Sequence, residues 1–139
     1  MNATTPTRDY ALEQMNHLLT RLASEVHRAA KHSGPDEVHD LRVSIRRFSQ
    51  GLSVFYDFFP AGEMKKVKKR LKHMMRLTSQ IRDRDITLEF LASAKNNAHH
   101  WRFERERSAY GHEFSEMVRR WSERDFSAKW RRDLSLRGV

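Results

Sequence analysis

Apolar residues recur every three or four positions along most of the chain, and this spacing restricts the fold more than any other feature. Steps of three and four are clearest in the stripe formed by Val38, Leu41, Ile45, Phe48, Leu52, Phe55 and Phe59. This is the period of one face of an α-helix. Only five glycines and three prolines punctuate the 139 residues. We therefore predict an all-α fold, an up-down antiparallel bundle of about four to five helices.

Capping residues and breakers predict the boundaries of the first two helices. Thr7 is suited to cap a helix that continues to about residue 31. Ser33 or Gly34 can cap the second helix, and Pro35 suits its first turn. Pro60 then ends that helix after Phe59.

The rest of the chain predicts three further segments. A third helix covers about residues 63–79, and a break near residues 79–82 separates it from a fourth helix. The fourth helix begins around Asp83 or Asp85, and we expect its apolar residues to face inward: Ile86, Phe90 and Leu91. A further helix covers about residues 98–123, and residues 126–134 form a short terminal turn.

Composition and length exclude several classes of protein. The chain has no cysteine, which excludes disulfide scaffolds and thiol catalysis. No apolar run is long enough to cross a membrane, and residues 1–6 lack the apolar core of a signal peptide. We expect one domain over residues 1–139, with ends that fray at 1–6 and 133–139. The expected location is the cytoplasm.

Positive charge is concentrated in one third of the sequence. The formal net charge is +9, and residues 39–84 hold twelve Lys and Arg against four Asp and Glu. The remaining residues are close to neutral. Because concentrated like charge repels itself, such a segment is typical of proteins that bind an anionic partner.

Two basic stripes follow helical spacing within this segment. His39, Arg42 and Arg46 lie on one side of the predicted second helix, and Arg47 lies further round. The next helix repeats the pattern with Lys65, Lys68, Lys69, Lys72 and Arg76. If the two helices pair through their apolar stripes, these side chains line one groove. Forked guanidinium donors and mobile ammonium groups both suit anionic oxygens.

The position of the aromatic residues narrows the choice of anion. Phe48, Phe55 and Phe59 belong to the apolar stripe of the second helix and not to its basic side. Proteins that bind single-stranded nucleic acid interleave exposed aromatics with positive charge so that bases can stack. The basic stripes therefore favour phosphates without bases.

Two motifs resemble those of the CHAD family, the conserved histidine α-helical domain. The first is VHDLRVSIRR at residues 38–47, and the second is QIRDRDITLEFL at residues 80–91. Members of this family are helical domains that bind inorganic polyphosphate through a basic channel. The resemblance implies that the ligand is contacted by His39, Arg42, Arg46, Arg47, Lys65, Lys68, Lys69, Lys72 and Arg82, to which the stripe adds Arg76. It implies a structural role for Asp83, which would orient Arg82 or cap the fourth helix.

The number of motif copies distinguishes this chain from typical members. They carry two four-helix halves in one chain, whereas this sequence has one copy of each motif. The resemblance is therefore to a single-repeat, half-length member. We expect two chains to form a homodimer that completes the channel, since a twofold interface uses the same patch on each subunit.

The favoured interpretation is a non-catalytic polyphosphate-binding module without a cofactor or a metal site. Three alternatives stay open. The same basic face could bind nucleic acid, or it could dock on acidic protein surfaces or storage granules. A metal-dependent phosphohydrolase needs clustered carboxylates, and only Asp40 and Asp83 lie near the basic stripes.

Overall fold

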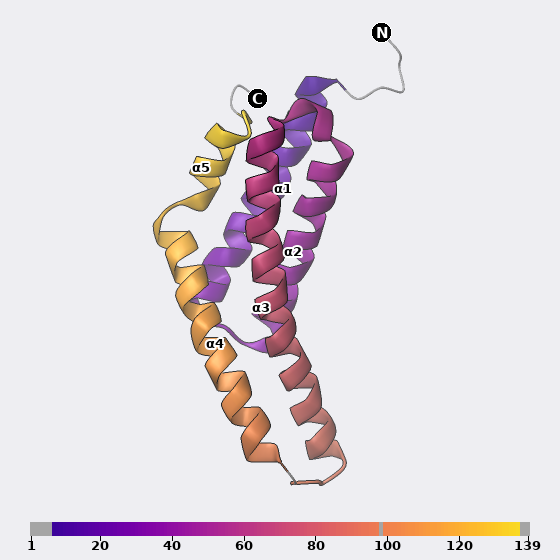
Figure 1. Ribbon diagram of the computed structural model, residues 1–139, viewed down its shortest axis with the longest axis vertical. Helices are drawn as coiled ribbons and strands as arrows, with labels where there is room; N and C mark the ends of the chain where they lie inside the picture. Colours follow the sequence, from indigo (N-terminus) through magenta and orange to yellow (C-terminus); the bar gives the residue numbers. More distant parts are fainter. Residues whose placement is uncertain (1–6, 98, 137–139) are drawn as a thin grey trace.

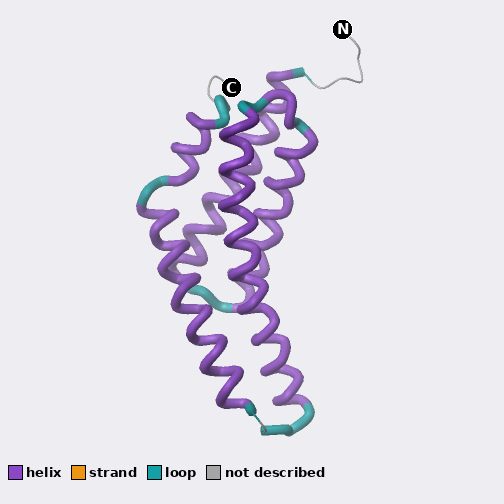
Figure 2. The backbone as a smooth tube through the Cα atoms, viewed as in Figure 1, coloured by secondary structure: helices purple, strands orange, loops and turns teal. Residues whose placement is uncertain are grey.

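The computed structural model describes residues 7–97 and 99–136, and these residues form helices joined by short connections (Figure 2). The elements in chain order are α1 (Arg8–Lys31), α2 (Pro35–Val54), the short 3₁₀ helix η1 (Tyr56–Phe58), α3 (Ala61–Ser93), α4 (His100–Glu123) and α5 (Phe126–Asp133). The described residues contain no strand. The predicted all-α fold class is confirmed.

The four long helices form one antiparallel bundle. α1 packs against α2 and α4, and α3 packs against the same two helices, which closes the bundle. α5 contacts α1 and α4. Figure 1 shows the α3–α4 hairpin extending past the connection between α1 and α2, so the far ends of these two helices lie outside the four-helix part.

The predicted starts of the first two helices are confirmed. Thr7 caps α1, and its hydroxyl accepts a hydrogen bond from the backbone N–H of Tyr10 at 3.2 Å. Gly34 is the N-cap of α2 and Pro35 occupies its first turn. Asp36 and Glu37 follow, where carboxylates favour the positive end of the helix dipole.

The second helix ends earlier than predicted. α2 stops at Val54, and η1 connects it to Pro60. Phe59 is extended, with φ −120° and ψ 147°, because a residue before proline is disfavoured in the α region. The turn nevertheless returns Phe59 to the core, where 7% of its surface is exposed. The prediction that Phe59 belongs to the core is therefore confirmed, although the helix does not continue to it.

The predicted break at residues 79–82 is wrong, and α3 runs without interruption from Ala61 to Ser93. The Thr78 hydroxyl stays within the helix, where it donates to the carbonyl oxygens of Met74 and Met75 at 3.0 and 3.1 Å. Thr78 and Ile81 are both fully buried, so the core-facing line continues through the expected break. A buried face keeps a segment helical even where its local propensity is weak.

The core lies among α1, α2, α3, α4 and α5. Its largest fully buried side chains include Met15, Leu41, Phe48, Met74 and Phe114. Trp130 on α5 stacks on Phe48 of α2, with ring centroids 6.0 Å apart and an interplanar angle of 16°. This contact attaches the short terminal helix to the core. Of the ends expected to fray, 1–6 and 133–139, residues 1–6 and 137–139 lie outside the described residues. In the described part of the second segment, Leu134 and Leu136 are buried.

Two residues expected to face inward are exposed. Ile86 and Phe90 are 52% and 69% exposed, while Leu91 is buried as predicted. Both lie in the part of α3 that extends past α1 and α2, where only α4 is available for packing. Trp101, at the start of α4, is also exposed. The α3–α4 hairpin therefore presents an apolar surface at its far end.

Candidate functional site

Arg42 of α2 is held against α3 by a set of short hydrogen bonds. Its Nη1 donates to the carbonyl oxygen of Met75 at 3.0 Å, and to the hydroxyls of Thr78 and Ser79 at 2.9 Å each. All three acceptors belong to one turn of α3. Within the described residues, Nε and Nη2 of Arg42 have no hydrogen-bond partner, so these donors remain available to a ligand.

The surroundings of Arg42 disfavour its own charge. Partial burial lowers its pKa, and the nearby cations Arg46 and Arg82 lower it further. The Asp83 carboxylate acts in the opposite direction. Arg42 stays protonated at any ordinary pH, because a guanidinium keeps its proton in proteins. Three cations from α2 and α3 thus converge, as the helical spacing predicted for Arg42 and Arg46.

His39 of α2 extends this group at one end. Arg82 Nη1 lies 3.4 Å from His39 Nδ1, and both side chains are exposed. Because a guanidinium only donates, Nδ1 is the acceptor in this contact. The other ring nitrogen of His39, Nε2, is then the one that can donate a hydrogen bond to an anion beside Arg82.

At the other end of the α2–α3 contact, Lys68 Nζ donates to the Ser53 hydroxyl of α2 at 2.9 Å. Lys72 is one turn further along α3 and is exposed. Arg46, Ser49 and Ser53 line a shallow depression of about 490 Å³ beside them. We name the whole set the α2–α3 ridge; its members are His39, Arg42, Arg46, Lys68, Lys72 and Arg82.

Other predicted residues lie elsewhere. Lys69 and Arg76 line a separate cavity on the α4 side of α3. Arg47 is exposed and sits about 100° around α2 from Arg46. Lys65 is exposed near the start of α3, one turn before Lys68 and on the same side of that helix, and within the described residues no hydrogen bond joins it to α2. The structure therefore does not bring all the predicted lysines and arginines into one groove.

The predicted cap at Asp83 is wrong, because α3 is continuous and has no N-terminus there. Its backbone carbonyl accepts a hydrogen bond from the Thr87 hydroxyl at 2.8 Å, as in the interior of a helix. Within the described residues its carboxylate forms no ion pair with Arg82. Its influence is the electrostatic one on Arg42 described above.

The second half of the Arg82–Asp85 motif faces α4. Arg84 pairs with Glu106 at 3.1 Å, and Asp85 pairs with Arg107 at 2.9 Å. Hydrogen bonds from Arg102 and then from Arg84 lower the pKa of Glu106. These partly buried pairs fix the position of α3 against α4. The two arginines of this motif therefore lie on different sides of α3: Arg82 belongs to the α2–α3 ridge, and Arg84 lies in the interface between α3 and α4.

The cavity on the other side of α3 was not predicted from the sequence. It has a volume of about 670 Å³ and lies between α3, α4 and α5, with cations from all three helices and an aromatic wall. Arg120, Arg124 and Lys129 contribute from the part of the chain whose net charge is near zero. Their spacing of four and five residues is compatible with one shared surface. Only the packing of α5 shows that this surface is the cavity.

Comparison with protein-family models matches residues 9–136 to the CHAD domain. The chain belongs to the CHAD-domain family. Neither a curated protein nor a solved structure matches it significantly. The matched segment of this CHAD domain includes all five α-helices apart from Arg8, the first residue of α1. Both sequence motifs and the α2–α3 ridge lie within it.

Two other kinds of site are absent from the described part of the CHAD domain. None of its helices has the length and apolar character needed to cross a membrane. No three His, Asp or Glu side chains gather there in an arrangement that could hold a metal ion.

Replacing Thr78 with valine tests whether Arg42 is anchored as described. Valine keeps the shape but removes the buried hydroxyl that Arg42 contacts, so we expect a loss of about 1–2 kcal/mol in the free energy of unfolding, measured with urea. Thr87→Val is the matched control, because its exposed hydroxyl bonds only to its own helix. Equal losses in the two variants would contradict the anchoring role.

Proposed function

We propose that this CHAD domain binds inorganic polyphosphate without catalysis, and that the α2–α3 ridge is the binding surface. The observation that carries the proposal is the group of cations at the α2–α3 contact. Arg42 is hydrogen-bonded to α3, Arg82 lies 3.4 Å from His39 one turn before Arg42, and Arg46 lies one turn after it. Two cations ~10 Å apart repel by roughly 1–2 kcal/mol at an effective dielectric near 20. An anionic chain lying along the ridge removes that repulsion and releases its own counterions.

The shape of the ridge supports a long anion over a single phosphate. Its two ends are marked by the His39–Arg82 contact and the Lys68–Ser53 contact. His39 and Ser53 are fourteen residues apart on α2, so the ridge is ~20 Å long. One phosphate can occupy only part of this length, whereas a chain of phosphates can contact each cation in turn.

The ridge also argues against the alternatives. Its members are five Lys and Arg residues and one histidine, and the exposed Phe90 lies about two turns beyond Arg82 on α3. A nucleic acid bound along the ridge itself would therefore find no ring interleaved with the cations on which its bases could stack, which favours polyphosphate over single-stranded nucleic acid. Of the two carboxylates near the basic stripes, Asp40 is already paired with Arg28 at 3.1 Å. That leaves Asp83 as the carboxylate next to the ridge, which is a poor basis for metal-dependent hydrolysis.

We further propose that two copies associate through the exposed end of the α3–α4 hairpin. Ile86 lies one turn beyond Arg82 on α3, and Phe90 lies one turn beyond Ile86. Their exposed surfaces therefore continue the ridge along the same side of the helix. Burial of this apolar surface against a second copy would place two ridges in sequence along one polyphosphate chain. Such a protein acts in the cytoplasm, on polyphosphate granules.

Adding long-chain polyphosphate at low salt is expected to raise the melting temperature and to stabilise a particle with the mass of two chains. The melting temperature rises because the ligand binds only the folded protein. Light scattering with and without polyphosphate measures the mass. Phe90→Asp is expected to remove the dimer while leaving the melting temperature of the free chain unchanged, because Phe90 is exposed.

The absence of any thermal shift with polyphosphate would refute the binding function. A stable dimer of the Phe90→Asp variant would refute the interface while leaving the binding function intact. Duplex or single-stranded nucleic acid that displaces polyphosphate at equal charge concentration would favour a nucleic-acid ligand instead.

A further inference from the structure

The cavity between α3, α4 and α5 differs from the α2–α3 ridge in chemistry as well as in position. It is a concave space of about 670 Å³, within the range of sites for small organic ligands. Its rim is cationic, whereas part of its wall is apolar and aromatic. The ridge has no corresponding apolar wall, so the two surfaces suit different anions.

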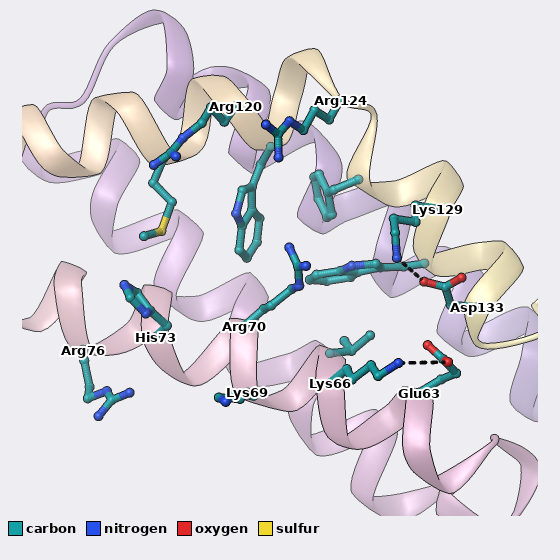
Figure 3. A pocket seen from close by; sticks show the side chains of 15 residues that line it. Glu63, Lys66, Lys69, Arg70, His73, Arg76, Arg120, Arg124, Lys129 and Asp133 are labelled. Carbon is teal, nitrogen blue, oxygen red and sulfur yellow. Dashed lines mark hydrogen bonds and ion pairs between the residues drawn. The ribbon is translucent and has the colours of Figure 1, made fainter.

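Several cations of the rim have no acidic partner. Lys66 pairs with Glu63 at 3.6 Å, and Lys129 pairs with Asp133 at 2.6 Å (Figure 3). The cavity's remaining cations form no ion pair within the described residues; they are Lys69, Arg70, Arg76, Arg120 and Arg124. The rim therefore has an excess of positive charge that neighbouring carboxylates do not neutralise.

The unpaired arginines are placed to hold one ligand from two sides. Figure 3 shows Arg70 extending from α3, and Arg124 extending from the C-terminal end of α4, into the space between these helices. A guanidinium can donate two parallel hydrogen bonds to phosphate oxygens. Two of them on facing helices suit a ligand with more than one phosphate group.

The wall of the cavity is a packed aromatic cluster. Trp121 and Phe126 have ring centroids 5.2 Å apart, and Trp130 lies 5.4 Å from Trp121 and 4.9 Å from Phe126. Trp130 is also stacked on the core residue Phe48. Trp121 is only partly buried, so part of its ring is open to a ligand. A planar ring gains from stacking on such a surface, whereas a chain of phosphates does not.

We propose that this cavity binds a small phosphorylated molecule that carries a planar ring, of the nucleoside di- or triphosphate class. Arg70 and Arg124 bind its phosphates, and the ring lies against Trp121. This inference does not depend on polyphosphate binding at the ridge, because the cavity and the ridge lie on opposite sides of α3 and share no residue.

Fluorescence titration of the full chain with ATP tests the proposal directly. Trp101→Phe removes the exposed tryptophan distant from the cavity, so the remaining emission comes from Trp121 and Trp130. In EDTA, ATP is expected to change this emission saturably and to bind roughly tenfold more tightly than tripolyphosphate, which has the phosphates without the ring. Adenosine, which has the ring without the phosphates, is expected to bind at least tenfold more weakly than ATP.

Two variants separate the cations from the aromatic wall. The double variant Arg70→Ala, Arg124→Ala is expected to weaken ATP binding at least tenfold, while Arg119→Ala, an exposed arginine of α4 outside the cavity, leaves it unchanged. Trp121→Leu is expected to weaken ATP binding and to leave tripolyphosphate binding as it was. Thermal melts of each variant establish that the fold is intact.

Three results would overturn the proposal. The first is equal affinity of the protein for ATP and for tripolyphosphate. The second is a loss of ATP affinity in Arg119→Ala as large as that in the Arg70→Ala, Arg124→Ala variant. The third is loss of ATP binding when the ridge residues Arg46 and Lys72 are replaced instead. In a parallel experiment, the wild-type protein is titrated with long-chain polyphosphate. Polyphosphate binding without a ring preference would refute this inference alone, whereas ATP binding without polyphosphate binding would refute only the function proposed for the ridge.

Discussion

Replacing Arg46 and Lys72 with alanine is expected to weaken binding of long-chain polyphosphate by roughly 30-fold at 0.1 M salt. Each cation that neutralises a phosphate contributes about 0.7–0.9 to the slope of log K against log salt, as for nucleic acids. The ridge has five Lys and Arg members, which predicts a wild-type slope of about −3.5 to −4.5. Loss of two cations should reduce the magnitude of this slope by about 1.4–1.8.

Both substitutions leave the fold intact, because Arg46 and Lys72 are exposed and form no ion pair within the described residues. The slope is measured by titration at several salt concentrations between 50 and 200 mM. Arg119→Ala with Arg132→Ala is the matched control, since it removes the same charge from exposed positions on α4 and α5. A control that loses as much affinity and slope as the ridge variant would show that net charge, and not the ridge, binds polyphosphate.

Replacing Phe48 with alanine is expected to lower the free energy of unfolding by about 3–5 kcal/mol. Phe48 is fully buried on α2, and its ring stacks on Trp130 of α5. The substitution removes a large apolar side chain and also the aromatic contact between α2 and α5. Urea unfolding followed by far-UV circular dichroism measures the change in stability.

Tyr56→Ala is the control for the loss of an aromatic ring. Tyr56 is 57% exposed in η1, so its replacement should change the free energy of unfolding by less than about 0.5 kcal/mol. A loss of under about 1 kcal/mol for Phe48→Ala would contradict the described packing of α5 on α2. The aromatic wall of the cavity would then lose its structural basis as well.

The parts of the fold that follow from local rules could be predicted from the sequence. The cap at Thr7, the turn at Gly34–Pro35 and the apolar stripe of α2 each depend on residues close together in the chain. The continuity of α3 does not. Its Thr78–Ser79 pair resembles a breaker locally, but Arg42 contacts both hydroxyls from another helix. Such a tertiary contact has no local signature.

Of the α2–α3 ridge, only the α2 residues could be predicted from the sequence, because their arrangement depends on local helical spacing and not on tertiary contacts. Helical spacing places Arg42 and Arg46 next to one another whatever surrounds them. The α3 cations cover a wide arc, and the sequence does not say which of them face α2 and which face α4. The structure places Lys68 against Ser53 and places Lys69 and Arg76 at the cavity. Which α3 cations face α2 and which face the cavity depends on how α4 and α5 pack against α3. That packing cannot be predicted from the sequence of any one helix.

The extension of α3 and α4 past the other helices has a consequence for stability within the molecule. Among the described residues from 82 to 110, only Leu91 is buried, so this hairpin is held mainly by polar pairs such as Asp85–Arg107. Segments with few buried apolar contacts open at lower free energy than a packed core. The hairpin can therefore unfold locally while the remaining bundle stays intact, and its exposed apolar end is the part of the protein most easily reshaped by a partner.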